Sequence, residues 1–267
     1  MEIESMNSKH ISIPIAAILS ILFQFACIAS CDAAPHVVLG RGAITPLFSN
    51  KEISLSFLKV DIKLQTTKYI VSCVLHLNNP GNGTKLIVGF PLWYASQNKT
   101  YSKFVRNKIH INGQRITFEE TSRPMRSGNF LPCVDYLGGL YFGPRYFIRE
   151  MRWYASYATF PGGQKTIITD DFELPYVSKD CFELYFLYGF SGLWSKKVER
   201  IIFTIDCSNI GGSANISTHF DTFKTGESPP ETNSLNTLRM KTYKDLISFE
   251  IYDLSTSPAD HLRISKP

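Results

Sequence analysis

The sequence lacks the short motifs that mark metal centres and many hydrolase sites. No H-E-x-x-H or C-x-x-C pattern occurs among its 267 residues, and His76, His110 and His219 are isolated from one another along the chain. The spacings typical of zinc ligands are therefore missing, and we predict neither a metal nor a cofactor. No nucleophile, base or metal cluster lies at workable spacing, which favours a protein that is not an enzyme.

The sequence also lacks a strong excess of charge of either sign. It has 28 Lys+Arg against 23 Asp+Glu, a net charge of +5, and this surplus is spread along the chain. A dedicated nucleic-acid binder concentrates positive charge on one surface, so we do not expect nucleic acid as a partner. With 44% hydrophobic residues, the chain is able to bury a core.

One stretch is both long and hydrophobic. Residues 11–30 carry no charge and follow Lys9 and His10, the arrangement of a secretory signal peptide. We therefore predict that residues 1–30 are a signal peptide and that the protein is exported. An uncleaved membrane anchor is the alternative, which Pro14 and Gln24 weaken, because roughly 20 apolar residues suffice to span a bilayer.

The end of this stretch matches a lipidation pattern. Residues 28–31 read I-A-S-C, which resembles the bacterial lipobox, in which the cysteine is diacylated and becomes the new N-terminus. Cys31 is thus a candidate lipidation site, and its lipid would be the protein's only contact with a membrane. The alternative is ordinary cleavage near Ala33 or Ala34, which leaves Cys31 unmodified.

The cysteines beyond the signal favour an oxidising compartment. They are Cys73, Cys133, Cys181 and Cys207. The runs 181–188 and 200–207 look like strands on either side of a glycine-containing turn segment, and antiparallel pairing would bring Cys181 opposite Cys207 or one residue away. We predict this disulfide. Cys73 lies on an apolar strand face, where a buried thiol and a bridge to Cys133 both remain open.

We predict that the body of the chain consists of strands separated by turns. Apolar residues recur at every second position over 60–65 and 70–77, the period of two residues that strands show, and these runs predict a hairpin or a neighbouring pair. Asn79–Gly83 (N-P-G-N-G) is the strongest turn signal, and a strand-like run follows it over 84–90. Further turn signals fall at residues 112–113, 138–139, 161–163, 211–212 and 226–233.

Short strands at this density of turns predict an all-β fold with antiparallel β-sandwich architecture. We expect two sandwich-like domains, an N-terminal one over 40–120 and a C-terminal one over 150–267. An irregular linker over 121–149 is expected between them, because arginine, glycine, proline and aromatic residues mix there without a clear period.

Aromatic residues make up 13% of the chain, and an exposed aromatic face suits stacking against a sugar or a partner protein. Trp93 and Tyr94 are the preferred candidates for ligand contact. The wider set of possible platforms is Trp93, Tyr94, Tyr141, Phe142, Tyr146, Trp153, Tyr154 and Tyr157. The competing interpretation is that most of these residues belong to the core.

Two further patterns suggest chemistry but fit a structural role better. Asp170, Asp171 and Glu173 lie close enough in sequence to hold a cation, yet a calcium loop spaces its oxygens more regularly, so a solvated strand edge is favoured. Residues 189–192 (G-F-S-G) fall short of the G-x-S-x-G nucleophile elbow, and they indicate a hairpin turn.

Two long segments, residues 42–93 and 153–206, resemble a family of bacterial exported proteins known only as a domain of unknown function. The motifs that carry the resemblance are V-G-F-P at 88–91, a tryptophan followed by F-P-G at 160–162, Y-F-L-Y-G followed by a tryptophan, and a closing strand I-S-F-E-I at 247–251. The resemblance implies an all-β fold and a location in the cell envelope. It implies no activity.

These observations predict a non-enzymatic exported envelope protein, a binding or structural module whose partner is an envelope protein or a glycan. The alternative is a secreted hydrolase whose site is assembled from distant segments. A pocket lined by Asp170, its acidic neighbours or a histidine with a strongly shifted pKa would favour the hydrolase. A shallow aromatic surface rimmed by polar groups would favour binding.

Overall fold

Strands make up almost all of the regular structure in the part of the chain that is described. The computed structural model describes residues 38–47, 52–94, 106–121, 141–142, 146–147, 150–176, 183–188, 194, 198–222, 238–254 and 260–266. Within these ranges there is no α-helix, and the only helical turns are the 3₁₀ turns Ser208–Ile210 and Ser213–Asn215. The predicted all-β fold is confirmed.

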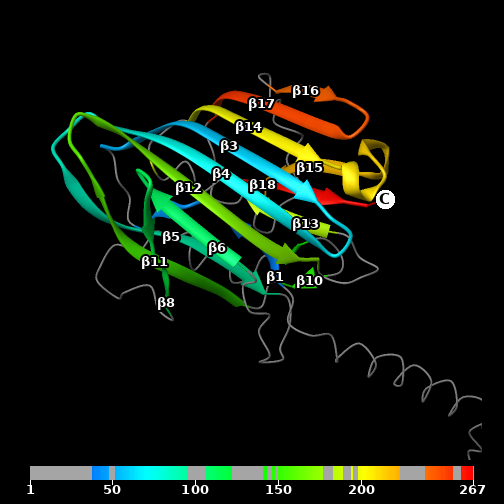
Figure 1. Ribbon diagram of the computed structural model, residues 1–267, viewed down its shortest axis with the longest axis horizontal. Helices are drawn as coiled ribbons and strands as arrows, with labels where there is room; N and C mark the ends of the chain where they lie inside the picture. Colours follow the sequence, from blue (N-terminus) through cyan, green and yellow to red (C-terminus); the bar gives the residue numbers. More distant parts are fainter. Residues whose placement is uncertain are drawn as a thin grey trace, which may run out of the picture. The chain divides into compact units, whose positions relative to one another are not determined.

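The described strands form two large sheets of eight strands each (Figure 1). The first sheet has the order β15-β18-β13-β1-β5-β11-β8, and β2 pairs with β5 beside this path. Its strands are β1 (Val38–Gly42), β2 (Thr45–Pro46), β5 (Thr84–Tyr94), β8 (Glu119–Thr121), β11 (Glu150–Phe160), β13 (Glu183–Leu187), β15 (Ser217–Thr222) and β18 (Asp260–Ser265).

The second sheet has the order β16-β17-β14-β3-β4-β12-β6-β7. Its strands are β3 (Ser54–Leu64), β4 (Lys68–Asn79), β6 (Arg106–Ile111), β7 (Gln114–Ile116), β12 (Gln164–Pro175), β14 (Val198–Asp206), β16 (Arg239–Thr242) and β17 (Leu246–Leu254). A separate short ribbon pairs β9 (Tyr141–Phe142) with β10 (Tyr146–Phe147).

The predicted alternation is visible in β3 and β4. Along β4 every second residue from Tyr69 to Asn79 is buried, and β3 pairs with it antiparallel, with Val60 opposite Cys73. The expected pair of neighbouring strands is therefore confirmed. The turn signal at 79–83 also marks a real turn, because β4 ends at Asn79 and β5 begins at Thr84. This turn carries the chain from the second sheet to the first.

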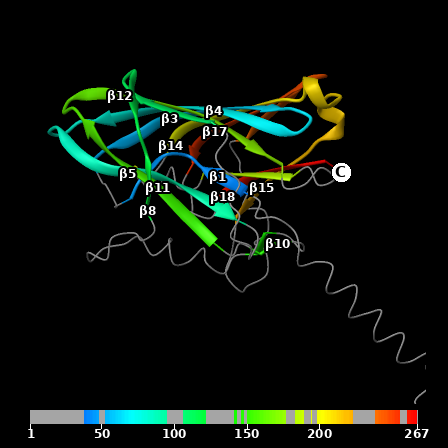
Figure 2. The same ribbon diagram turned by 60° about the horizontal axis from the view of Figure 1, so that its bottom comes forward.

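The core lies between the two sheets, which pack face to face (Figure 2). Phe186 of β13 meets Phe203 of β14 edge-on, with ring centroids 6.1 Å apart. Trp194 is fully buried, and its indole Nε1 donates a hydrogen bond to the backbone oxygen of Ile44 at 3.0 Å. Buried aromatic rings therefore fill part of the interior. Of the eight aromatic residues proposed as platforms, Trp153 is buried and Tyr157 is exposed.

Both sheets are mixed and not purely antiparallel as predicted. β1 runs parallel to β13, and β14 runs parallel to β3. Both parallel pairs join segments that are far apart in sequence. The alternation of apolar residues shows which face of a strand is buried, but it does not show which distant strand lies alongside or in which direction.

The expected division into two sandwiches, 40–120 and 150–267, is not what the structure shows. Strands from both ranges take part in both sheets, and residues 36–267 form one compact unit. β5 from the first range, for example, pairs along its whole length with β11 from the second. Of the expected linker over 121–149, only Thr121 and the ribbon residues of β9 and β10 are described.

The expected Cys181–Cys207 disulfide is not formed here, because Cys207 is a buried free thiol. The prediction assumed that residues 181–188 pair with residues 200–207, but β13 and β14 belong to different sheets. Two strands that face each other across a core show the same apolar alternation as two neighbours in one sheet. Cys73 is likewise a buried free thiol, and Cys133 and Cys181 lie outside the described residues.

The N-terminal predictions fall outside the described residues, since residues 1–30 and Cys31 are not among them. In the part of the chain that is described, no helix has the length and apolar character needed to cross a membrane.

Candidate functional site

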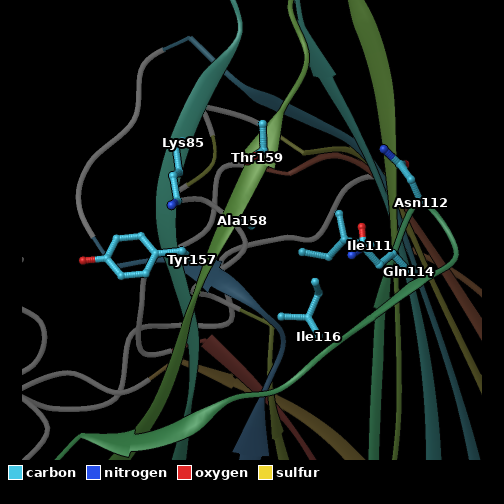
Figure 3. Close-up of a pocket in the computed structure, with 8 residues that line it drawn as sticks. All are labelled: Lys85, Ile111, Asn112, Gln114, Ile116, Tyr157, Ala158 and Thr159. Atoms are coloured by element: carbon cyan, nitrogen blue, oxygen red, sulfur yellow. The ribbon is translucent and has the colours of Figure 1, made fainter.

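A pocket of about 380 Å³ lies where the edges of the two sheets face each other (Figure 3). One wall comes from β5 and β11 of the first sheet, and the other comes from β6, β7 and the turn between them in the second. The residues that line it are Lys85, Ile111, Asn112, Gln114, Ile116, Tyr157, Ala158 and Thr159.

The first wall carries an aromatic ring and a positive charge. Lys85 of β5 lies opposite Thr159 of β11 in the antiparallel register, so the lysine and Tyr157 are diagonal neighbours on the same face. The Lys85 Nζ lies 4.9 Å from the centroid of the Tyr157 ring. Tyr157 is 57% exposed, so much of its surface remains open to a ligand although the ammonium group lies over the ring.

The second wall is a tight hairpin fixed to its neighbour. Asn112 and Gly113 have φ values of 51° and 81°, which glycine and asparagine adopt most readily. The Asn112 backbone N–H donates to the Ile167 oxygen at 2.8 Å, and the Asn112 Oδ1 accepts from the Ile167 N–H at 2.8 Å. The turn predicted at 112–113 therefore exists, and it holds Gln114 at the rim of the pocket.

The inner side of the pocket is apolar. Ile111 and Ala158 are buried, and Ile116 packs against the core. Figure 3 shows Ile111 and Ile116 on the β6–β7 side of β11, whereas the Tyr157 ring lies on the other side of the strand and points away from them. The pocket thus combines an apolar floor, an aromatic ring, one ammonium group and several hydrogen-bonding side chains, which is the usual composition of a small-ligand site.

The turn between β4 and β5 and the turn between β11 and β12 contact each other and hold the first wall in place. The buried Asn79 side chain donates from Nδ2 to the backbone oxygens of Asn82, at 2.9 Å, and Phe160, at 3.0 Å. Gly162 approaches the other turn so closely that an added Cβ would lie 2.6 Å from the Gly81 oxygen. These contacts tie the start of β5 to the end of β11, next to Lys85.

A buried ion pair lies deeper in the interior. Arg41 of β1 donates from Nη2 to Asp170 Oδ2 at 2.7 Å, and both side chains are fully buried. The guanidinium carbon lies 3.6 Å from the ring centroid of Phe90 and 4.1 Å from that of Phe172. The pair therefore joins the two sheets through a charge clamped between two aromatic rings.

Burial changes the titration of this pair. Loss of solvation raises the pKa of Asp170 to about 6, although Arg41 opposes the shift. Loss of solvation also lowers the pKa of Arg41, and this effect outweighs the opposing attraction of Asp170. Asp170 is not among the residues that line the pocket. Its raised pKa therefore reflects burial in the core.

The three acidic residues considered for calcium do not converge. Asp170 faces the core, whereas Asp171 is exposed and accepts a hydrogen bond from the Ser72 hydroxyl at 2.5 Å. Glu173 is paired with the Lys68 ammonium. No cluster of three potential metal ligands occurs within the described ranges. Adjacent residues of a strand point to opposite faces, which separates Asp170 from Asp171 and Glu173.

The structure does not test Trp93 and Tyr94, the predicted ligand contacts. Their main chains belong to the end of β5, and their side chains lie outside the described residues. Eight residues separate Lys85 from Trp93, a distance of about 27 Å along an extended strand. Among the proposed aromatic residues whose side chains the structure describes, Trp153, Tyr154 and Tyr157, only Tyr157 lines the pocket.

Sequence reasoning missed the polar members of the pocket. Lys85, Asn112 and Gln114 carry no motif, and only the turn at 112–113 gave a signal. Their proximity depends on how the edges of two sheets meet, which local patterns do not encode. The residues 189–192, where a nucleophile elbow was considered, lie outside the described residues.

The fold and the pocket together define a two-layer β-sandwich protein with a small site at its edge. No protein-family model and no curated protein sequence matches the chain. A candidate nutrient-binding protein from Legionella pneumophila has a similar structure, with a TM-score of 0.52 and 12% identity over 86% of this chain and 72% of that one. At this identity the likeness shows a shared fold and no more.

Two peptidases resemble the chain more weakly. An M1 zinc metallopeptidase from Deinococcus radiodurans gives a TM-score of 0.36 at 8% identity, over 82% of this chain and 43% of that one. Aminopeptidase A from Legionella pneumophila gives 0.34 at 10% identity, over 84% of this chain and 22% of that one. Similarity at this level carries no functional argument.

Proposed function

We propose that this protein is a binding protein without enzymatic activity, and that its ligand occupies the pocket between Lys85 and the β6–β7 turn. The observation that carries the proposal is the exposed Tyr157 ring beside an ammonium group, in a pocket whose inner side is apolar. This is the aromatic surface with a polar rim that binding modules use.

The lining also indicates the chemistry of the ligand. Lys85 is the only charged side chain among the eight lining residues, so a negatively charged group is favoured there. Gln114 and Thr159 are exposed side chains that offer hydrogen-bond donors and acceptors. A ligand with an acidic group and an apolar or ring-shaped body fits this set.

The similar Legionella structure is described as a candidate nutrient-binding protein. That description agrees with a binding role for this fold, but 12% identity transfers no ligand to this chain. The alternative of a secreted hydrolase gains no specific support, because the one described carboxyl with a strongly raised pKa, Asp170, is 0% exposed and bound to Arg41.

We further propose that the protein is exported to a bacterial cell envelope, where its partner is an envelope protein or glycan. The uncharged run 11–30 and the resemblance to exported envelope proteins support this. Intact-mass analysis of the expressed chain is expected to show loss of residues 1–30 and a diacylglyceryl group on Cys31. A chain that still begins at Met1 would contradict export, and an unmodified Cys31 would contradict lipidation.

Saturation-transfer NMR tests the binding role with defined probes. The panel contains glucuronate, glucose of the same ring size without the charge, and an acetylated acidic peptide, each mixed with the full chain. We expect at least one acidic probe to give a signal that Tyr157→Ala abolishes. Tyr243→Ala is the matched control, since Tyr243 is 59% exposed but belongs to a distant turn. Equal signals from both variants, or none from any probe, would contradict the proposal.

A further inference from the structure

One edge of β11 is only partly paired. On one side β11 pairs with β5 over its whole length, from Glu150 to Phe160. On the other side β8 pairs only with Trp153–Ala155. In the described part of the chain, no strand pairs with residues 156–160 on this side. Alternate backbone N–H and C=O groups along this segment therefore point toward the pocket side of the strand.

The pocket encloses this edge from both faces of the sheet. Tyr157 and Thr159 are exposed on the outer face, whereas Ala158, between them, is buried on the inner face. All three line the pocket. An occupant that reaches all of them has groups on both faces of the sheet, as an extended strand does, because its successive side chains alternate between faces.

We propose that the ligand is an extended peptide that adds as a strand to β11 beside residues 157–159. This inference rests on the binding role proposed above and specifies the ligand of that same pocket. Strand addition is a recurring mode of peptide recognition, in which main-chain hydrogen bonds give affinity and alternate side-chain pockets give specificity. It also satisfies backbone groups that an exposed edge leaves open.

The side chains around the edge define the sequence that this peptide should have. Side chains on the outer face of the added strand meet Lys85 and Tyr157, so an acidic residue is favoured there. The side chain between two such positions turns inward to Ile111 and Ile116, where an apolar residue fits. The expected ligand therefore alternates acidic and apolar residues.

A peptide fits this site better than a glycan does. A glycan would use the Tyr157 ring and Lys85 but would have no repeating donors and acceptors to match the strand edge. The three residues 157–159 span about 10 Å, so about three residues of the peptide lie within the pocket. The rest of the peptide would extend along the edge toward residues 156 and 160.

Fluorescence anisotropy with a labelled peptide, Gly-Glu-Val-Glu-Val-Glu-Gly, tests the main-chain pairing. Two further peptides carry N-methyl groups either on the three glutamate amides or on the two valine amides. A strand at an edge directs only one of these two sets of N–H groups at β11. We expect one methylated peptide to bind at least about tenfold more weakly and the other to retain affinity within about threefold. Equal effects of the two methylated sets would overturn strand addition.

Charge reversal tests the position of the peptide. Lys85→Glu is expected to weaken binding of the glutamate peptide by about fivefold to tenfold and to favour a peptide with lysine in place of glutamate. Lys241→Glu, on the exposed strand β16 at the far edge of the second sheet, serves as control and should change nothing. Equal effects of the two substitutions would overturn the assignment to this pocket.

The two proposals fail in different ways. If glucuronate gives a signal that depends on Tyr157 while no peptide binds, the peptide assignment is wrong and the binding role stands. If neither probe gives a signal that depends on Tyr157, the binding role itself is wrong.

Discussion

At the scale of single residues, the buried Arg41–Asp170 pair is the most consequential feature of the interior. It connects β1 of the first sheet with β12 of the second through a 2.7 Å hydrogen bond. Phe90 and Phe172 hold the guanidinium between their rings. The attraction within such a pair rarely exceeds the cost of removing both charges from water, but breaking it leaves one buried charge without compensation.

Replacing one or both members separates these two effects. Arg41→Met keeps an apolar contact with the two aromatic rings but leaves Asp170 buried without its cation, and we expect a loss of about 3–5 kcal/mol in unfolding free energy. Arg41→Met combined with Asp170→Leu should unfold with a free energy equal to that of the wild type or higher by about 1–4 kcal/mol. Urea denaturation measures both. A double variant as unstable as the single one would contradict this prediction.

The pair also predicts how stability depends on pH. Burial raises the pKa of Asp170 to about 6 from 3.8, while Arg41 acts against the shift and Asp171 adds to it. The folded protein thus holds the Asp170 proton more tightly than the unfolded chain does. The contribution of this proton to the unfolding free energy is therefore complete below pH 4 and is lost as the pH rises through 6. The double variant lacks this titration.

We therefore expect the stability advantage of the double variant over the wild type to grow between pH 4 and pH 6.5, by on the order of 2 kcal/mol, and then to level off. Urea denaturation across this range measures the difference. A difference that stays constant with pH would show that Asp170 titrates in the folded protein as it does in the unfolded chain.

At the scale of elements, the corner between β4 and β5 positions the candidate site. Asn79 bonds the Asn82 and Phe160 oxygens, so one side chain fixes both the start of β5 and the end of β11. Lys85 and Tyr157 lie within a few residues of this corner. A loss of order here should therefore weaken both stability and ligand binding.

Asn79→Ala leaves the Phe160 oxygen without this donor in a buried position, and we expect a loss of about 1–3 kcal/mol in unfolding free energy. Affinity for the acidic peptide should fall as well. Asn78→Ala is the matched control, because Asn78 faces the opposite side of β4. Similar losses of stability in the two variants would contradict the role assigned to Asn79.

Individual strands were largely predictable from sequence, but their partners were not. Apolar residues at every second position placed β3 and β4 correctly, and the glycine-containing turns at 79–83 and 112–113 marked real corners. The runs around β13 and β14 are both rich in apolar residues, yet these strands belong to opposite sheets. The pattern of apolar residues shows which side chains are buried. It does not show whether the strand that covers them lies beside them in the same sheet or faces them from the other sheet.

The candidate site was less predictable than the strands for a related reason. Tyr157 was one of eight aromatic residues considered as stacking platforms, but Lys85 and Gln114 are ordinary surface residues in sequence. They meet because the edge of β11 faces the β6–β7 hairpin of the other sheet. Such juxtapositions follow from the order of strands in both sheets, which requires long-range pairing that the sequence pattern leaves open.

At the scale of the whole molecule, the interleaving of early and late strands should make folding cooperative. Residues 36–267 form one compact unit, and β5 and β11 pair over eleven registered positions. Neither 40–120 nor 150–267 can complete a sheet alone. We expect a single unfolding transition in differential scanning calorimetry.

Limited proteolysis complements the calorimetry. A cut between residues 121 and 150 should leave the two fragments associated under native conditions, because each sheet needs strands from both. Two separate unfolding transitions, or a fragment over 40–120 that stays folded after purification by itself, would restore the two-domain interpretation.

Backbone chemical-shift mapping tests the location of the binding site most directly. The isotope-labelled chain is titrated to saturation with the probe that gives the strongest saturation-transfer signal. The binding role predicts the largest shift changes at residues 111–116 and 157–159, together with Lys85, and small changes at Trp93 and Tyr94. Shift changes centred on Trp93 and Tyr94, or spread evenly over both sheets, would contradict the assignment of the ligand to this pocket.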